Sequence, residues 1–409
     1  MSFGFQFDES EMDEEYLNSP SSSSMQPQQA SSSSQAPSTD QVPFKSHCIH
    51  DMLQNLPSRI SYSSIDVNLP PRDRSNSGRV HKLLRRDLFD ARFQMLLDED
   101  EDEDEVQEQR ATKPSPIAQD KANVDAESDL IPGVYEGGLK TWECALDLVE
   151  TLDALHAIAG GSEGNGSWSS RLSSKHVLEL GCGTALPTLF ILSQMLKDPP
   201  HAGAGLSLHL ADYNAQVLQL VTLPNLILAW WASPEAAPFH AGQEADLLRQ
   251  ERQELERRGQ DHFDTSTLAT DQEEGELAIT DELLAAFSSS LQERGIELKF
   301  YSGAWSNFPP SLKREGAGAK MDMTLTSETI YSLDSLPALV ELLSRYAKPD
   351  AATSEAGLVL VAAKVIYFGV GGGVESFKQT LSQLTPSASV EPLHSITKGV
   401  GRTVLSVSF

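Results

Sequence analysis

Short apolar runs alternate with longer amphipathic segments along the chain from about residue 129 to its end. Short runs bounded by Gly, Asp, Ser or Lys are typical of buried strands, whereas longer segments with apolar residues three and four apart are typical of helices. The strands predicted in this way are 176–181, 206–212, 297–303, 321–327, 357–364 and 403–409. A helix is predicted directly after the first of them, at 186–196. This alternation predicts an α/β fold with a mostly parallel sheet and helices on both faces.

An amphipathic helix is also predicted before the first strand. The segment DLIPGVYEGGLKTWECALDLVETLDAL (129–155) begins with turn residues and continues with apolar residues at helical spacing. The apolar face of this helix consists of Trp142, Ala145, Leu146, Val149 and Leu152.

The first part of the chain has a different composition. Residues 1–125 are rich in Ser, Gln, Pro, Asp and Glu, and such segments bury too little apolar surface to offset the entropy lost on ordering. We therefore expect a low-complexity, largely disordered acidic region. Helical spacing predicts one short helix in it, at 80–97, and the acidic run at 98–105 is expected to stay solvated.

The remaining residues, 126–409, are long enough for one α/β domain. A charged, Gln-rich stretch at 233–290 interrupts the alternation of strands and helices. Because surface loops can be lengthened at small entropic cost, we expect this stretch to be an insertion between the second and third strand units.

Charge and targeting signals narrow the class of partner. The chain carries 59 acidic and 31 basic residues, a net charge of −28. Like charges repel, so direct nucleic-acid binding is not expected, whereas a basic partner suits this charge. The N-terminus lacks a signal peptide, and the longest apolar stretch, 357–374, is interrupted by Lys364, so no membrane association is expected. The three cysteines are far apart and form no metal motif, so no metal is expected.

A glycine turn follows the first predicted strand. In VLELGCGTALP, Gly181 and Gly183 stand where the backbone of an α/β protein approaches a ligand at the carboxyl edge of the sheet. A dinucleotide-binding turn needs Gly or Ala at a third position, which here is Leu186, and no phosphate-binding lysine follows. The turn therefore favours a ligand without phosphates.

S-adenosylmethionine is such a ligand. Glu179, inside the first strand, suits its cationic groups by charge, and Asp212 ends the second strand, where a carboxylate accepts hydrogen bonds from ribose hydroxyls. Asp212 alone does not discriminate, because NAD sites share such a residue. The combination with the glycine turn predicts a methyltransferase.

Several segments together resemble the protein-histidine methyltransferase family, in particular its fungal members. These segments are SDLIPGVYEGGLKTWECALDL, VLELGCGTALPTL, ADYNAQVLQLVTLPN, YSGAWSNF, DMTLTSETIYSLDSLPAL and KVIYFGVGGGVESF. The resemblance covers nearly all of 128–409 except the insertion. It implies a Rossmann-like seven-stranded sheet with a C-terminal antiparallel strand, and S-adenosylmethionine-dependent methylation of a histidine, at its tele nitrogen, in a ribosomal protein of the large subunit.

The resemblance also implies the residues of the site. It implies that Ser327 and Glu328 close the fourth strand beside the transferred methyl group. From that place we expect Glu328 to be catalytic, as the carboxylate that fixes the tautomer of the acceptor imidazole. Tyr331, three residues later, is the second expected catalytic residue and lines the acceptor pocket or else packs against the end of the sheet. The implied cofactor-binding residues, together with Glu179 from the argument above, are Thr141, Trp142, Glu143, Cys144, Ala145, Gly181, Cys182, Gly183, Asp212, Tyr213, Asn214, Gly303, Ala304, Trp305 and Ser327. The glycine run 371–373 is implied as a lip over the acceptor. The chain departs from the family at Ala185 and Leu186, where relatives often carry a small residue and a glycine.

Two other functions stay open at this stage. A methyltransferase of the same fold can be directed at lysine, and a cofactor-binding chain can act as a scaffold for the assembly of a ribosomal protein. For a histidine methyltransferase we expect a monomer in the cytoplasm and nucleus, with a basic ribosomal protein as its partner.

Overall fold

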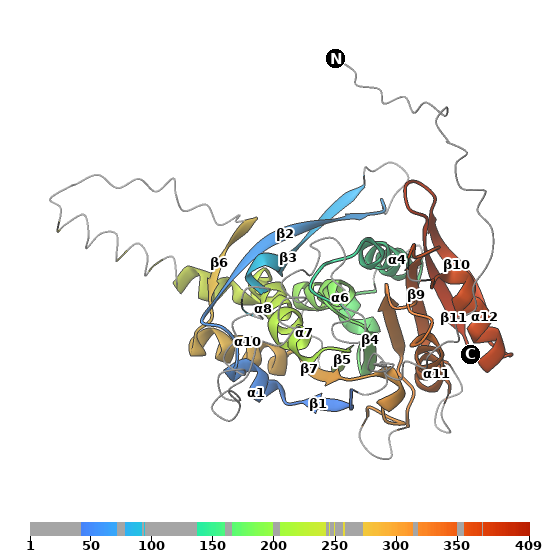
Figure 1. Ribbon diagram of the computed structural model, residues 1–409. Helices are drawn as coiled ribbons and strands as arrows, with labels where there is room; N and C mark the ends of the chain where they lie inside the picture. The colour runs from blue at the N-terminus through green and yellow to red at the C-terminus, as the bar shows by residue number, and fades with distance from the viewer. Residues whose placement is uncertain are drawn as a thin grey trace, which may run out of the picture. The chain divides into compact units, whose positions relative to one another are not determined.

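A computed structural model of the chain describes residues 42–71, 78–91, 137–159, 166–198, 205–242, 273–313, 318–349, 356–369 and 371–409, together with single helical residues at 94, 245, 249 and 257 (Figure 1). The acidic run at 98–105 and the predicted boundary between residues 125 and 126 lie outside these ranges.

An eight-stranded sheet forms the centre of the described fold, with the strand order β1-β7-β5-β4-β8-β9-β11-β10. Its strands are β1 (Lys45–His47), β4 (Lys175–Leu180), β5 (Leu206–Asp212), β7 (Ile296–Ser302), β8 (Met323–Ser327), β9 (Leu358–Lys364), β10 (Ser389–Ile396) and β11 (Arg402–Ser408). The five strands from β7 to β9 are parallel, and β1, β11 and β10 are antiparallel to their neighbours. The predicted mostly parallel sheet with a C-terminal antiparallel strand is thus confirmed, and β1 is the strand beyond the seven expected.

The parallel strands are apolar on both faces because helices cover both. In β4, Val177 packs into the core on one face and Leu178 into the core on the other, and both are buried. On the first face lie α4 (Glu143–Ala159), α6 (Leu186–Lys197), α8 (Leu223–Trp231) and α10 (Asp281–Glu293), and on the second α11 (Leu336–Ala347) and α12 (Val374–Leu384). The predicted helix at 186–196 is α6, and the helix predicted before the first strand is α4.

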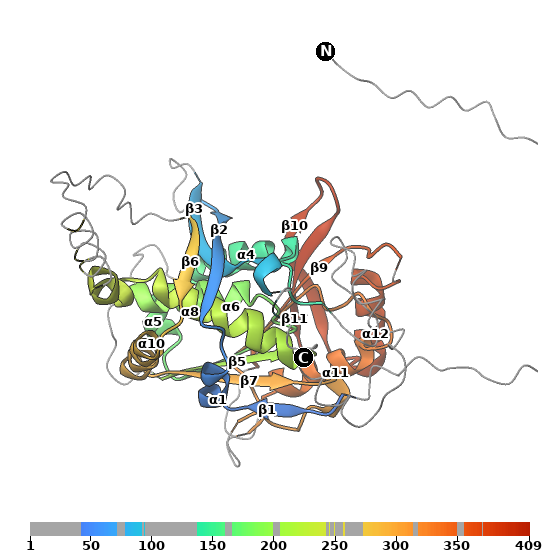
Figure 2. The same cartoon turned by 60° about the vertical axis from the view of Figure 1, so that its left-hand side comes forward.

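A second sheet lies on the far side of the helices of the first face. It consists of β3 (Arg79–Arg86), β2 (Arg59–Leu69) and β6 (Glu274–Ala278), all antiparallel. In Figure 1, β2 and β3 pass above α4, α6 and α8, and Figure 2 shows β3, β2 and β6 side by side. The small sheet shares one core with these helices. The described fold is therefore layered as small sheet, helices, main sheet and helices.

The small sheet corrects two predictions for the N-terminal part of the chain. Residues 42–71 and 78–91 fold into strands and helical turns, so the expectation of a disordered region over 1–125 is wrong there. The helix predicted at 80–97 is also wrong over its first part, because Arg79–Arg86 is a strand and helix begins only at residue 88. Pairing with β2 decides this conformation, and a partner strand is a tertiary contact that local spacing does not reveal.

The predicted insertion at 233–290 is too long at its C-terminal end. Residues 274–278 form β6, which pairs with β2, and α10 begins at Asp281. Leu283 and Phe287 of α10 are fully buried, so this helix belongs to the core. The rest of the stretch beyond residue 242 lies almost entirely outside the described residues.

Shorter elements complete the described chain: α1 (Ile49–Gln54), α5 (Trp168–Arg171), α7 (Ala215–Val217), the π-helical turn Leu218–Thr222, and the 3-10 turns Pro234–Ala236 and Trp305–Asn307. No single helix in the described parts of the chain is long and apolar enough to cross a membrane. The stretch 215–242 meets that length and composition only as two helices bent by 73°.

Candidate functional site

A cavity of about 410 Å³ opens at the carboxyl edge of the main sheet. The ends of four parallel strands contribute Gly181, Asp212, Ser327 and Lys364 to its wall. This is the edge at which open α/β sheets bind ligands, and the volume falls within the range of small-molecule sites.

Most of the predicted site residues meet in this cavity. Those in its wall are Trp142, Ala145, Gly181, Cys182, Gly183, Asp212, Tyr213, Ala304, Trp305, Ser327, Glu328 and Tyr331. Those that do not line it are Thr141, Glu143, Cys144, Glu179, Asn214 and Gly303.

The glycine turn is shaped by close packing. Gly181 and Gly183 have φ values of +63° and +49°, in the left-handed region. A Cβ atom on Gly181 would lie 2.4 Å from the Thr329 side chain, and one on Gly183 would lie 3.1 Å from the carbonyl oxygen of Gly138. Larger residues would therefore displace the walls of the cavity at both positions.

Asp212 is fixed beside this turn. Its Oδ2 accepts a hydrogen bond from the Gly183 N–H at 2.9 Å, and its Oδ1 accepts one from the Asn214 N–H at 3.1 Å. These two bonds hold the carboxylate in the wall of the cavity, beside the glycine turn.

Ala185 closes the turn at the start of α6. It is fully buried and has φ = +56°, a conformation that is unusual for alanine. The turn therefore takes a left-handed conformation at a non-glycine residue.

Glu179 does not take the predicted place beside a cationic ligand. It is buried under the first turn of α6, where Oε2 accepts hydrogen bonds from the backbone N–H and the hydroxyl of Thr188. Burial raises the pKa of Glu179 to about 8. We correct the prediction: Glu179 joins the first strand to the following helix and does not line the cavity.

Three further predicted residues lie outside the cavity and contact the segments that form or adjoin its wall. The Thr141 hydroxyl donates to the Thr184 hydroxyl at 3.0 Å, and the Asn214 side chain donates to the Gly137 carbonyl at 3.2 Å. Gly303 has φ = +126°, and a Cβ there would lie 2.5 Å from the Pro43 carbonyl oxygen. The glycine at 303 is thus required by the N-terminal segment that crosses it, which sequence spacing did not reveal.

Glu328 is held in an unusual backbone conformation at the end of β8. Its φ is +58°, and its N–H donates to the Ala362 carbonyl of β9 at 2.9 Å. Non-glycine residues in this region cost free energy and are found preferentially at functional sites. The side chain is about 9% exposed, and Oε1 has no hydrogen-bond donor among the described residues.

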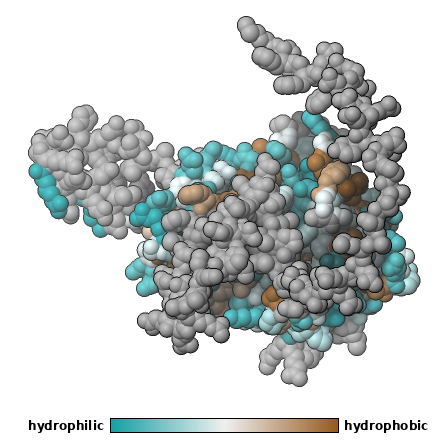
Figure 3. Space-filling model, in the orientation of Figure 1, coloured by the Kyte–Doolittle hydropathy of each residue, from teal (hydrophilic) through white to brown (hydrophobic). Residues whose placement is uncertain are grey.

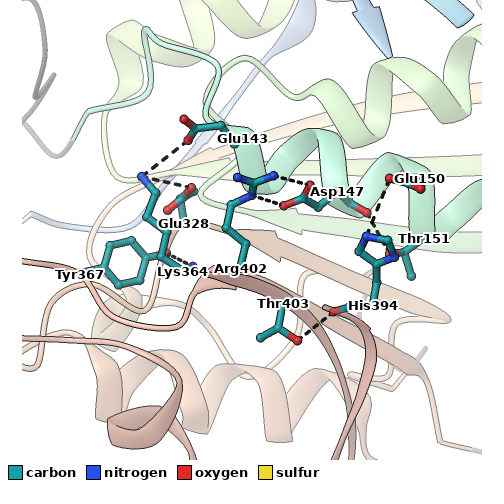
Figure 4. A network of polar contacts seen from close by, with 10 residues as sticks. All are labelled: Glu143, Asp147, Glu150, Thr151, Glu328, Lys364, Tyr367, His394, Arg402 and Thr403. Carbon is teal, nitrogen blue, oxygen red and sulfur yellow. Dashed lines mark hydrogen bonds and ion pairs between the residues drawn. The ribbon is translucent and has the colours of Figure 1, made fainter. Parts of the chain in front are cut away.

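A lysine that the sequence argument missed lies beside Glu328 (Figure 4). Lys364 Nζ is 3.7 Å from both Glu328 Oε1 and Glu143 Oε2, and lies 4.5 Å from the centre of the Trp142 ring. Glu143 is thus outside the cavity but linked to it through Lys364. The sequence did hold a signal for Lys364: it is a charged residue at the end of an apolar strand, as Asp212 is at the end of β5.

The charge of Glu328 acts on two neighbouring groups. Burial and then the Glu328 carboxylate raise the pKa of the Cys144 thiol and the pKa of the Tyr367 phenol. Both groups are therefore neutral at pH 7. Cys144 is a buried neighbour of the cavity, whereas Tyr367 lines it, 6.3 Å from the ring of Tyr331.

The cavity thus has two regions. The glycine turn, Asp212 and the Ala304–Trp305 loop form one, which fits a nucleoside. Glu328, Lys364 and the rings of Trp142, Tyr331 and Tyr367 form the other, which fits the reacting groups. The wall residues that were not predicted are Gly137, Gly138, Lys140, Thr184, Thr329, Ser335, Ala338, Lys364, Ile366, Tyr367, Phe368 and Val400.

Two curated proteins are similar in sequence to most of the chain. No protein-family model matches the chain. Histidine protein methyltransferase 1 of Saccharomyces cerevisiae is 32% identical over 332 residues, which cover 80% of this chain and 76% of the relative. The Schizosaccharomyces pombe protein of the same name is 29% identical, over 90% of this chain and 86% of the relative. A solved methyltransferase structure with bound S-adenosylhomocysteine is 10% identical, with a TM-score of 0.32, and the match covers 67% of this chain and 51% of that one.

The strand order and the ligand cavity at the carboxyl edge define a Rossmann-like methyltransferase domain. The chain belongs to the histidine protein methyltransferase 1 family. The predicted enzyme class, a protein-histidine methyltransferase that uses S-adenosylmethionine, is thereby confirmed.

Proposed function

We propose that the chain methylates the tele nitrogen of a histidine in a basic protein of the large ribosomal subunit. The observation that carries the proposal is the Glu328 carboxylate, which is nearly buried, lines the cavity and has an oxygen without a hydrogen-bond donor among the described residues. Such a carboxylate can hold one ring nitrogen and free the other, and the resemblance implies that the tele nitrogen is the one methylated. The ribosomal substrate follows from the resemblance and from the net charge of −28, which suits a basic partner.

The residues that would hold the cofactor belong to the nucleoside region. Gly181 and Gly183 let the backbone approach the ligand, Asp212 accepts from ribose hydroxyls, and Trp305 and Tyr213 line the wall. When bound, S-adenosylmethionine supplies a methyl group on a sulfonium, which a neutral nucleophile can attack.

The acceptor needs orientation more than deprotonation. Imidazole titrates near pH 6.5, so most of it is neutral at or above pH 7. Glu328 accepts a hydrogen bond from the pros N–H, which leaves the lone pair of the tele nitrogen free for the methyl group. The same carboxylate stabilises the positive charge that forms on the ring. The aromatic side chains of Trp142, Tyr331 and Tyr367 exclude water around it.

Lys364 favours histidine over lysine as the acceptor. Its side chain is about 17% exposed and Nζ lies 3.7 Å from Glu328 Oε1, so a second ammonium group at Glu328 would meet a like charge, whereas a neutral imidazole would not. A lysine acceptor must also lose a proton from a group with a pKa near 10.4 before it can attack the methyl group.

The test is incubation of the full chain with labelled S-adenosylmethionine and large-subunit ribosomal proteins, followed by mass spectrometric mapping of the labelled residue. We expect label on one histidine, at the tele nitrogen. The control is Gly183→Arg, which places a large side chain against the Gly138 backbone and should abolish both cofactor binding and labelling.

Two results would contradict the proposal. Label on a lysine would make the chain a lysine-directed enzyme. If wild type and Gly183→Arg retained the same ribosomal protein without labelling it, the chain would instead be an assembly scaffold.

A further inference from the structure

Large apolar side chains are exposed around the mouth of the cavity. The described residues include ten large hydrophobic side chains that are strongly exposed, and five of them gather here. We call these five the apolar rim: Leu333, Val365, Ile366, Phe368 and Val400. Phe368 is 83% exposed and Ile366 55%. Contiguous exposed apolar groups of this kind mark interaction sites on proteins.

Three separate segments carry the apolar rim, and backbone hydrogen bonds join them. The Val365 N–H donates to the Gly401 carbonyl at 2.8 Å, which ties the end of β9 to the β10–β11 hairpin. Ser332 pairs with Gly371 in an antiparallel bridge, which ties the segment after β8 to the loop after β9. Gly372 allows this contact, because a Cβ there would lie 2.2 Å from the Tyr331 carbonyl oxygen. The rim is therefore a preformed surface.

The rim is continuous with the reacting region of the cavity. Ile366, Phe368 and Val400 line the same cavity as Glu328, whereas Leu333 lies outside it, against Gly371. Figure 3 shows apolar surface near the β10–β11 hairpin, which carries Val400. A ligand bound at Glu328 therefore shares one cavity with three side chains of the rim.

The length of the acceptor side chain brings its neighbours to the rim. A histidine ring is joined to its backbone by a single methylene group, so its Cα must come close to the cavity mouth when the ring reaches Glu328. The residues next to the histidine in the substrate then lie over the rim. Burying an aliphatic or aromatic side chain there removes apolar surface of both partners from water.

We propose that the apolar rim binds an aliphatic or aromatic side chain that lies within a few residues of the target histidine in the protein substrate. This inference rests on the proposed function and adds a sequence preference to it. The net charge of the chain attracts a basic substrate from a distance. The rim instead contacts the residues next to the histidine and so selects the segment that is methylated.

The test uses the full-length enzyme, labelled S-adenosylmethionine and a peptide library with one central histidine. Each flanking position is fixed in turn as Leu, Phe, Ser, Glu or Lys. Because burial of a Leu or Phe side chain favours binding, we expect Leu or Phe at one or two positions to raise kcat/KM about ten-fold or more over Ser. Phe368→Ser and Leu333→Ser should each remove most of this preference, chiefly through KM. Both variants should also raise KM for the ribosomal protein that the wild-type enzyme labels.

The matched control is Ile158→Ser. Ile158 is 75% exposed and lies 13 residues after Ala145 on α4, which places it about 20 Å from the cavity end of that helix. This variant should keep the preference. Calorimetry with S-adenosylmethionine verifies that each variant is folded, and Leu333→Ser, which does not line the cavity, should bind it as the wild type does.

Histidine labelling without a preference for apolar neighbours, or with a preference that survives in both rim variants, would overturn this inference and leave the proposed function intact. A preference for Lys at the flanking positions would also overturn the inference and leave the proposed function intact. If the wild-type enzyme labelled no histidine in either acceptor, the proposed function would fail and the inference with it.

Discussion

The carboxyl group of Glu179 shows how one residue can satisfy a motif without contacting the ligand. Sequence spacing places an acidic residue just before the glycine turn, and charge alone suggested a cation beside it. The side chain instead points to Thr188 and is buried, because strand residues alternate between the two faces of a sheet.

Glu179→Gln should therefore leave the affinity for S-adenosylmethionine within about two-fold of wild type, because a carboxyl group that keeps its proton near pH 7 is close to an amide in charge and shape. Glu179→Ala should lower the free energy of unfolding by about 1–3 kcal/mol, because it leaves Thr188 groups unpaired. Calorimetry and thermal unfolding measure the two effects.

The pH dependence adds a second check on Glu179. The pKa of Glu179 is about 8 in the folded state and near 4.5 in the unfolded state, so the folded state keeps the proton up to a higher pH. The free energy of unfolding should then decrease between pH 4.5 and 8, and this contribution should be absent in Glu179→Gln. Loss of cofactor binding in Glu179→Gln would instead place the carboxylate in the ligand site.

At the residue scale, the sequence predicted which residues meet in the cavity where their position follows from the end of a strand. Gly181, Gly183 and Asp212 are such positions, and all three line the cavity. Lys364 was missed because a lysine after an apolar run looks like a strand boundary. Its contact with Glu328 exists only because β8 and β9 are neighbours in the sheet.

At the scale of elements, the N-terminal segment 42–47 is the part that sequence patterns concealed. It is short, and β1 pairs with β7 to form the edge of the main sheet. The Val42 carbonyl accepts hydrogen bonds from the Ala304 N–H and the Asn307 side chain, and Phe44 stacks on Tyr301. Local propensity over so few residues carries little information, since the partner strand supplies the stability.

Deletion of residues 1–47 should weaken binding of S-adenosylmethionine about ten-fold, because the Ala304–Trp305 loop loses two hydrogen bonds and the stacked ring that hold it. Deletion of residues 1–41 is the matched control, since it keeps every one of these contacts. Calorimetry compares the two. Equal affinities would mean that the segment does not shape the cofactor site.

At the scale of the whole molecule, the main sheet was predictable because its parallel strands are buried on both faces and read as apolar runs. The small sheet was not, because β6 follows β2 by about 200 residues and lies in a stretch with the composition of an insertion. Strand β10 was not predicted as a separate strand, because most of its residues are exposed at the sheet edge.

The net charge is a property of the whole chain and predicts a salt effect. If the negative field attracts a basic substrate, kcat/KM should fall several-fold between about 50 and 200 mM salt, while kcat at saturating substrate stays nearly constant. Steady-state rates at both salt concentrations measure this. A kcat/KM that does not depend on salt would leave the charge without a role in substrate capture.

The central claim is that Glu328 orients the histidine and stabilises the charge that forms on its ring. Its most direct test is kcat for histidine methylation by Glu328→Gln, with cofactor binding verified by calorimetry. The matched control is Glu143→Gln, because Glu143 lies at the same 3.7 Å distance from Lys364 but does not line the cavity. We predict that kcat falls at least about 100-fold in Glu328→Gln and only a few-fold in Glu143→Gln. A Glu328→Gln enzyme that binds S-adenosylmethionine and methylates histidine at the wild-type rate would contradict the account.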